Sequence, residues 1–475
     1  MGSKSSTLSL GTDSIGKLLL RYAVPAIIAM ASSSLYHIID SIFVGHGVGG
    51  AAIAGMAITM PIMNIASAFG AMVGVGAAAR ISIRLGEGNK TAAEKTLGNA
   101  VLLNLVLGVA VMVGMLVFLD PILYLFSGGQ ATVQTIGYAR QFMQIIMAGN
   151  IITHLYLSLN EQVRASGYPR KSMYIMLAAV GVNLALNPLF IFKFGWGIRG
   201  SAAATVIAQF VAFVIAFSHF CSKNSFIRFK RKSFRFEWKI VFAILSIGLA
   251  PFLLNMCASM VAAFVNHALL LYGGTGVRDI VAATAGAGDI YVGAYGIINR
   301  VILLFIMIIQ GLNQGMQPIV GYNFGAKNFA RVRRTLMLTI CCGICIATVG
   351  FLLGQFAPSA IARAFVDSSK GGDEQAMIDA ATQGLRLVIL MFPLVGFQIV
   401  TGNFFQYIGK APLAIFMSLT RQLIFLLPLL WTLPRTLGAF GVWISMPIAD
   451  CASITLAAIF LVWQLRKMRR EERLR

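Results

Sequence analysis

The stretch Ser34-Leu-Tyr-His-Ile-Ile-Asp-Ser-Ile-Phe-Val-Gly-His-Gly47 places a carboxylate, Asp40, inside an apolar run that begins near Ile15. This run is long enough to cross a lipid bilayer, because a membrane-spanning helix needs roughly 20 apolar residues. A charged side chain inside such a helix costs about 2.5–3.5 kcal/mol on insertion scales, so it marks a functional site by default. The stretch therefore predicts a membrane-spanning helix that holds a functional acid.

The composition extends this prediction to the whole chain. Its 475 residues are 58% hydrophobic and 11% charged, which is more apolar surface than a soluble protein of this length can bury. We therefore expect an all-α polytopic membrane protein that is embedded in the lipid bilayer. The net charge of +22 is typical of loops that face anionic headgroups, and we expect no nucleic-acid partner.

Hydropathy predicts twelve membrane-spanning helices joined by short loops. The expected spans are residues 15–44, 51–80, 96–119, 136–160, 171–194, 199–221, 240–272, 289–320, 332–357, 382–408, 411–433 and 438–465.

The loops between these spans differ strongly in positive charge. Alternate loops together with the two terminal segments hold 28 of the 38 Lys and Arg residues, whereas the remaining loops hold only six. Loops rich in Lys and Arg stay on the cytoplasmic side of a membrane. The pattern therefore predicts a multi-pass protein of the bacterial plasma (inner) membrane, with both termini and the basic loop 223–239 in the cytoplasm.

The two halves of the chain repeat each other. Leu18–Pro25 is similar to Ile244–Pro251 at an offset of 226 residues, and Leu85–Asn89 is similar to Phe324–Asn328 at an offset of 239. Near Ser166 the offset is 242. Six spans followed by six give both halves the same orientation, so the repeat is parallel.

This repeat predicts two pseudo-symmetric six-helix bundles that face each other, with cargo between them. The expected domains are an N-terminal bundle, a basic cytoplasmic linker, a C-terminal bundle and a basic cytoplasmic tail, over residues 1–222, 223–239, 240–465 and 466–475.

Three features together resemble the multidrug and toxic compound extrusion (MATE) transporters. They are the pattern Ile39-Asp40-Ser-Ile-Phe-Val-Gly45, the turns at Gly86 and Gly325, and the six-plus-six repeat. The resemblance covers nearly the whole chain and points to the prokaryotic, DinF-like branch of multidrug exporters. It implies a V-shaped pair of bundles and the export of cationic or amphipathic small molecules in exchange for inward H⁺ or Na⁺.

In one branch of this family, the first-span Asp binds the coupling cation together with polar residues of spans four, five and six. The resemblance implies that Asp40, Asn160, Asn183, Asn187 and Thr205 form such a site, with Na⁺ as one candidate ion at all of these except Asn160. Some family members carry a second Asp at the position of Asn187, so the charge of the site and its preferred cation stay open.

The spacing of these residues is compatible with a single site. Asn183 and Asn187 are four residues apart and share one helix face. Asn187 and Thr205 lie nine residues on either side of Trp196, so we expect them at equal depth in the bilayer. Carboxylate, amide and hydroxyl oxygens suit a hard monovalent cation, and a desolvated carboxylate suits a proton. Interhelical hydrogen bonding is the structural alternative for the two Asn residues and Thr205.

Three residues of the first span are expected to act on Asp40. Tyr36, one helical turn away, is a candidate hydrogen-bond partner, and His37 is a weaker candidate for tuning the carboxylate. Pro25 weakens the backbone hydrogen bonds of the helix and permits it to bend.

Other ionisable residues leave alternatives open. Glu161 is either a second titratable group or a solvated residue at a helix end. Asp450 is expected either to form a buried ion pair with Arg300 or Arg421, or to belong to a second coupling or substrate site.

These observations favour a cation-coupled multidrug exporter that is a monomer. The alternative is a lipid-linked oligosaccharide or lipid flippase of the same superfamily, for which Arg300 and Arg421 are the only support. No phosphate-binding loop or nucleotide-binding domain is recognisable, so we expect no enzymatic activity and no cofactor other than the coupling ion, H⁺ or Na⁺.

Overall fold

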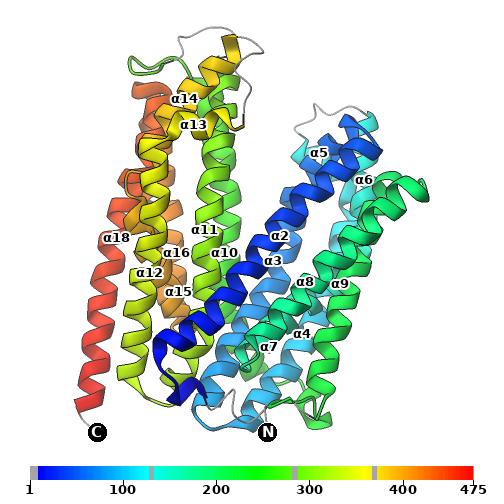
Figure 1. The fold of residues 1–475 in the computed structure, drawn as a ribbon, viewed down its shortest axis with the longest axis vertical. Helices are drawn as coiled ribbons and strands as arrows, with labels where there is room; N and C mark the ends of the chain where they lie inside the picture. The colour runs from blue at the N-terminus through cyan, green and yellow to red at the C-terminus, as the bar shows by residue number, and fades with distance from the viewer. Residues whose placement is uncertain (1–8, 128–132, 224, 281–286, 366–371, 474–475) are drawn as a thin grey trace. The chain divides into compact units, whose positions relative to one another are not determined.

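The computed structural model describes residues 9–127, 133–223, 225–280, 287–365 and 372–473. All regular structure in these ranges is helical, which confirms the expected all-α class (Figure 1). Ten described helices are long and apolar enough to cross a membrane, and two further spans are each a bent helix pair, which gives up to twelve.

The first half of the chain supplies six spans and one short helix. They are α2 (Ile15–Gly47), α3 (Gly50–Gly86), α4 (Lys90–Val117), α5 (Leu119–Phe126), α6 (Val133–Ala148) with α7 (Asn150–Ala165), α8 (Pro169–Pro188) with the π-helix η1 (Leu189–Lys193), and α9 (Gly197–Cys221).

After the short 3₁₀ helix η2 (Arg231–Phe234), the second half repeats this order of elements. They are α10 (Trp238–Tyr272), α11 (Ala287–Gly325), α12 (Phe329–Phe356), α13 (Pro358–Arg363), α14 (Gly372–Val388) with α15 (Phe392–Tyr407), α16 (Ala411–Leu419) with the π-helix η4 (Thr420–Leu426) and α17 (Leu427–Thr432), and α18 (Pro434–Arg473), which is broken at Gly438.

Two of the predicted spans are bent. α6 and α7 meet at 56° around Gly149, and α14 and α15 meet at 57° just before Pro393, which has no N–H for the helical ladder. The two bends occupy matching positions in the repeat, because Gly149 and Met391 are 242 residues apart. The parallel repeat inferred from the sequence is therefore also present in the order and shape of the helices.

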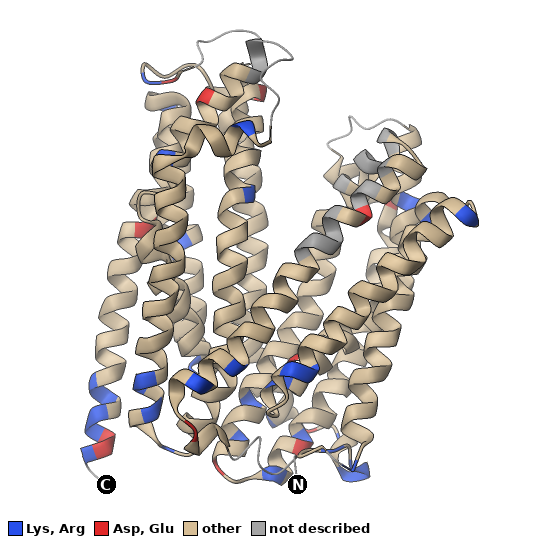
Figure 2. Ribbon diagram, viewed as in Figure 1, with Lys and Arg blue, Asp and Glu red and all other residues tan. Residues whose placement is uncertain are grey.

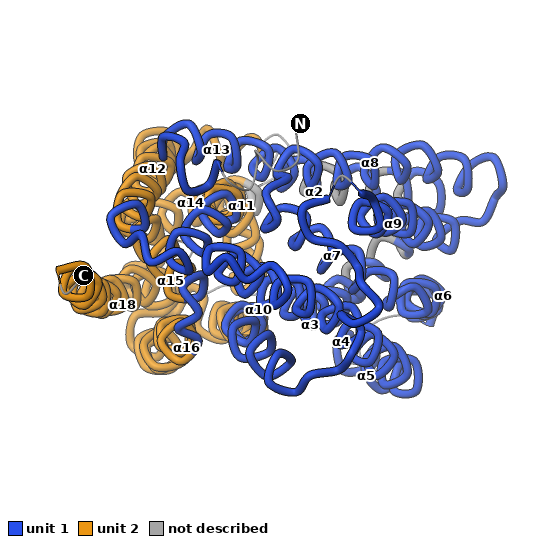
Figure 3. Tube along the Cα trace, turned by 90° about the horizontal axis from the view of Figure 1, so that it is seen from below, with its two compact units in different colours: residues 1–255, 314–332, 406–411 blue, residues 256–313, 333–405, 412–475 orange. Residues whose placement is uncertain are grey.

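The chain divides into two compact units, which are coloured in Figure 3. Unit 1 contains residues 1–255, 314–332 and 406–411, and unit 2 contains residues 256–313, 333–405 and 412–475. The predicted domain ends at 222 and 240 stay predictions. In unit 1, Lys and Arg gather at the end where α4 begins and α9 ends (Figure 2).

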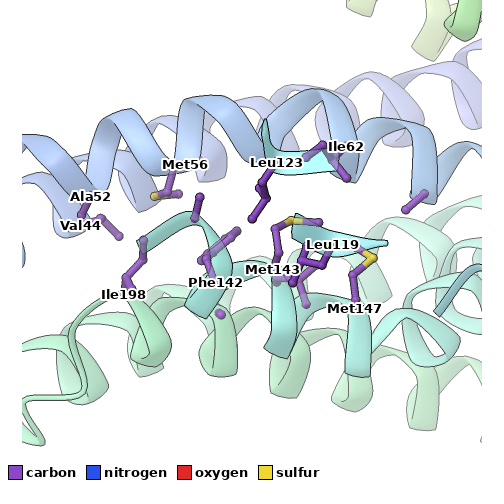
Figure 4. Close-up of a cluster of buried hydrophobic side chains, with 14 of the residues drawn as sticks. Val44, Ala52, Met56, Ile62, Leu119, Leu123, Phe142, Met143, Met147 and Ile198 are labelled. Atoms are coloured by element: carbon purple, nitrogen blue, oxygen red, sulfur yellow. The ribbon is translucent and has the colours of Figure 1, made fainter. Parts of the chain in front are cut away.

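An apolar cluster in unit 1 packs its helices together at the end away from the basic residues (Figure 4). Its members come from α2, α3, α5, α6, η1 and α9. The side chains drawn there include Val44, Ala52, Met56, Ile62, Leu119, Leu123, Phe142, Met143, Met147 and Ile198.

Candidate functional site

Three helices of unit 1 position the predicted polar residues. α8 packs along α2 and α9. α8 ends at Pro188, which has no N–H to donate to the carbonyl of Leu184, and the chain continues as the wider π-helix η1. This wide turn leads into α9, which returns antiparallel to α8.

Asp40 is buried, with an exposed fraction of 4%, and it is bonded to both neighbouring helices. Its Oδ1 accepts a hydrogen bond from Asn187 Nδ2 at 2.6 Å and another from Ser201 Oγ at 2.8 Å. Both bonds that it receives from described residues end on Oδ1, which leaves Oδ2 for a further ligand. Asp40 therefore joins α2 to α8 and α9.

The two amides of α8 extend this group. Asn187 Nδ2 also donates to Asn183 Oδ1 at 2.8 Å, and Asn183 Nδ2 donates to Thr205 Oγ1 at 3.2 Å. Among the described residues, the buried Oδ1 of Asn187 has no hydrogen-bond partner. A buried acceptor without a partner is costly, so this oxygen is a natural place for a ligand.

The pairing between α8 and α9 differs by one helical turn from the predicted one. The distances from Trp196 in the sequence predicted that Asn187 and Thr205 lie at the same depth. In the structure, Thr205 is hydrogen-bonded to Asn183 instead, and Asn187 and Ser201 both donate to Asp40. The spacing argument missed Ser201, although this residue lies one turn before Thr205 on the same face of α9.

The hairpin between these helices is centred on Phe194 rather than on Trp196. The π-helix ends just before Phe194, and the backbone N–H of Trp196 donates to the carbonyl of Phe190 at 3.0 Å. Asn187 and Ser201 are each seven residues from Phe194. A π-helix is not recognisable from hydropathy. The centre of the hairpin was therefore predicted two residues too late in the sequence.

A cavity of about 40 Å³ lies beside the Asp40 carboxylate. This volume accommodates roughly three water-sized spheres. Its wall combines one charge, a few polar groups and a soft apolar surface. The lining residues come from α2, α3, α6 and α9 and are Asp40, Met56, Thr59, Met60, Met63, Asn64, Phe142 and Thr205.

The oxygen atoms of this group suit a monovalent cation. The carboxylate of Asp40, the amide oxygen of Asn187 and the hydroxyls of Ser201 and Thr205 are hard ligands. One carboxylate balances one positive charge, whether that charge is carried by Na⁺ or by a proton. The residues present therefore fit either Na⁺ or a proton.

A family model described as MatE matches residues 25–189 and 270–432, which is more than half of the chain. The chain belongs to the MatE family. The two matched segments fall in the two halves of the repeat, and the resemblance seen in the sequence is confirmed.

Individual relatives agree with this assignment. The chain is 27% identical over 454 residues to the multidrug export protein MepA of Staphylococcus haemolyticus, which covers 96% of this chain and 94% of that protein. It matches an outward-facing structure of a multidrug resistance MATE family transporter with a TM-score of 0.87, 23% identity and coverage of 97% and 98%. A MATE structure in the bent conformation gives a TM-score of 0.88, with 22% identity and 98% of both chains covered.

In this MatE protein, Asn160 lies apart from the Asp40 group. Its backbone carbonyl accepts a hydrogen bond from Ser172 Oγ at 3.3 Å. Ser172 precedes Asn183 on α8 by 11 residues, which corresponds to roughly 16 Å along the helix. The structure therefore brings together Asp40, Asn183, Asn187 and Thr205, but not Asn160.

Asn150 is a further polar residue near the group that the sequence did not single out. It begins α7 directly after Gly149, and Gly149 packs against Val206, the residue that follows Thr205. Asn150 is buried, and its Nδ2 has no hydrogen-bond partner among the described residues. Asn150 therefore lies near the level of Thr205, and the Gly149-Asn150 pair in the middle of the predicted span 136–160 would have been the signal for it.

The two other acids that the sequence singled out, Glu161 and Asp450, are each paired with an arginine. Arg164 Nη1 donates to both carboxylate oxygens of Glu161 at 3.0 and 3.2 Å, and the Glu161 side chain is only 16% exposed. Glu161 is therefore not a solvated residue at a helix end. In unit 2, Arg421 Nε donates to Asp450 Oδ1 at 2.6 Å, whereas Arg300 is exposed on α11.

The Asp450–Arg421 pair is the buried ion pair expected from the sequence, and it occupies one of the two arginines that supported the flippase alternative. The side chains of Tyr36 and His37 lie outside the described residues. Pro25 is buried within α2, which continues through it as one helix.

Proposed function

We propose that this MatE protein is a secondary multidrug exporter, which moves cationic or amphipathic compounds out of the cell in exchange for inward H⁺ or Na⁺. The main support is one observation. The buried Asp40 carboxylate lies at the wall of a cavity that also presents three methionines and a phenylalanine. The relatives described as multidrug exporters support the same activity.

The side chains of this cavity wall suit contact with organic cations once the cavity widens beyond the volume of a few waters that it has in this structure. Met56, Met60 and Met63 recur at four- and three-residue spacing and therefore lie on one face of α3. Methionine side chains are flexible and polarizable, so they adapt to unlike apolar groups. Phe142 adds an aromatic ring that attracts cations, and Asp40 supplies the balancing negative charge.

The coupling then follows from competition for one carboxylate. A cation or proton at Asp40 replaces the need for the bonds from Asn187 and Ser201. α2 is then free to change its bend at Pro25, where the helix lacks one backbone hydrogen bond. Drug and coupling ion each favour a different state of the bundle, so each weakens the binding of the other.

The decisive test is the ion dependence of drug binding and export. We expect Asp40→Asn, which keeps the shape of the side chain and removes its charge, to abolish coupled export in a pump-deficient bacterium while the protein is still made. Drug affinity of the purified wild type should fall as H⁺ or Na⁺ concentration rises, and the Asn variant should lose this dependence.

Asp450→Asn is the matched control, because it removes a buried carboxylate that is paired with an arginine in unit 2, away from Asp40. This variant should keep the ion dependence of drug affinity even if its stability falls. Wild-type affinity that is independent of both ions would refute the mechanism. If expression of the wild type left the drug susceptibility of the pump-deficient bacterium unchanged, a flippase would be favoured instead.

A further inference from the structure

The linker between the two halves is folded onto α4 rather than extended. Asn99 of α4 donates from Nδ2 to the carbonyl of Arg235 at 3.0 Å and accepts from the backbone N–H of Glu237 at 2.8 Å. Gly98 lets the linker approach closely, because a Cβ added there would lie 2.1 Å from the carbonyl oxygen of Ser233. We call residues 225–239 the folded linker.

Two ion pairs and an aromatic cluster hold the folded linker in place. Lys230 pairs with Glu94 of α4 at 2.5 Å, and Glu237 pairs with Lys95 at 2.8 Å. The Glu94 side chain is only 3% exposed, so its carboxylate is shielded from solvent where it pairs with Lys230. The ring of Phe229 lies 5.6 Å from that of Phe220 and extends the contact to α9.

Four basic side chains of the folded linker remain on its surface. Arg231, Lys232, Arg235 and Lys239 are exposed, and none of them forms an ion pair with an acidic residue in the described part of the chain. The fixed backbone holds these charges within one short segment. They form a positive patch whose geometry is set by α4.

Exposed aromatic side chains flank this patch. Trp238 and Phe242 are 76% and 74% exposed and lie one turn apart on the first turns of α10. The ring of Trp238 contacts that of Phe236 edge to face, with centroids 5.0 Å apart. α10 is long and apolar enough to cross a membrane, so its beginning lies where the bilayer surface is expected. Trp is enriched at that level.

We propose that the folded linker binds the headgroup of an anionic phospholipid. Arg231, Lys232, Arg235 and Lys239 supply the donors for the lipid phosphate, while Trp238 and Phe242 contact its glycerol and upper acyl region. A free phosphate ion would use only the charges, and it would leave Trp238 and Phe242 exposed to solvent. The proposal does not depend on the transport mechanism proposed above.

Purified full-length protein in a neutral detergent, titrated with fluorescent phosphatidylglycerol, tests this proposal. The double variant Arg235→Gln/Lys239→Gln changes only exposed side chains and should weaken binding on the order of tenfold. Arg469→Gln/Arg470→Gln, which removes the same charge from exposed positions of α18, should keep the affinity within about twofold. Phosphatidylcholine should bind far more weakly than phosphatidylglycerol.

A second variant separates the fold of the linker from its charge. Asn99→Ala keeps every basic residue but removes both hydrogen bonds that hold residues 235–237, so binding should weaken without any change in net charge. Unchanged binding by this variant would overturn the role of the folded linker. Equal losses in the two double variants, equal affinity for phosphatidylcholine, or displacement of the lipid by low-millimolar inorganic phosphate would overturn the lipid site.

Discussion

One amide determines how the Asp40 group is connected. Asn187 donates its NH₂ group to both Asp40 and Asn183, while its oxygen has no hydrogen-bond partner among the described residues. An Asp at this position would donate nothing when ionised and would repel Asp40. The Asn therefore allows the carboxylate to stay buried, and it presents a neutral oxygen to an incoming ion.

Ser201 should matter nearly as much as the amide. Ser201→Ala leaves Asp40 with one hydrogen bond instead of two, and a bond to a charged group is worth about 1.5–3 kcal/mol. We expect a lower unfolding temperature in detergent and a slower drug efflux in vesicles, with more activity left than in Asp40→Asn. Ser218→Ala is the control, because that hydroxyl is exposed on α9 and bonds only to its own helix. Equal effects of the two variants would contradict the assigned role of Ser201.

Most residues of the site could be predicted because each carries a local signal. Asp40 is a carboxylate in an apolar run, and Asn183 and Asn187 are amides at helical spacing in another. Ser201 carries no such signal, since a serine in a spanning helix is common. Asn160 looked equivalent to the other amides, but sequence spacing does not give the depth of a residue in a bent span.

At the level of elements, the bend between α6 and α7 depends on close packing at Gly149. A Cβ there would lie 2.6 Å from both γ-carbons of Val206 on α9. The glycine thus allows the bent pair α6–α7 to pack closely against α9, the helix that carries Ser201 and Thr205. The bend and the site are parts of one packing arrangement.

Filling this contact should destabilise the bundle. Gly149→Ala is expected to cost about 1–3 kcal/mol of unfolding free energy by overpacking, and the double variant Gly149→Ala/Val206→Ala should recover most of it. Chemical unfolding in detergent measures both effects. Gly181→Ala of α8 is the control, because a Cβ there meets open space, and a gain of roughly 0.5–1 kcal/mol is expected from helix propensity. If the double variant did not regain unfolding free energy, the contact between Gly149 and Val206 would be refuted.

The number of spans could be predicted because hydropathy and the charge of the loops depend directly on which segments cross the membrane. The repeat could be predicted because similar residues recur in the two halves of the sequence. The bends and π-helices could not, since each depends on tertiary packing or on one missing backbone N–H. Gly149 and Pro393 are visible in the sequence, but many glycines and prolines of membrane helices do not break them. The two-residue error at the turn near Phe194 has the same origin.

On the scale of the whole molecule, the charge of the loops predicts the orientation of the protein. The strong excess of Lys and Arg in alternate loops, 28 against six, should place both termini and the linker in the cytoplasm. A fluorescent protein fused to the C-terminus should be bright in bacteria, and alkaline phosphatase fused there should be inactive. The reverse pair of results would contradict this orientation.

The group around Asp40 holds one carboxylate among the described residues, and this number sets a stoichiometry for the proposed exchange. Trading one H⁺ or one Na⁺ for one monovalent drug moves no net charge, so the membrane voltage does no work on such a cycle. Each tenfold ion gradient, worth about 1.4 kcal/mol, then sustains at most a tenfold drug gradient. A divalent drug would leave against an inside-negative voltage, at about 2.3 kcal/mol per 100 mV. Under the proposed exchange, a single acid makes the cycle electroneutral for monovalent cations, which are then the cargo that costs the least energy to export.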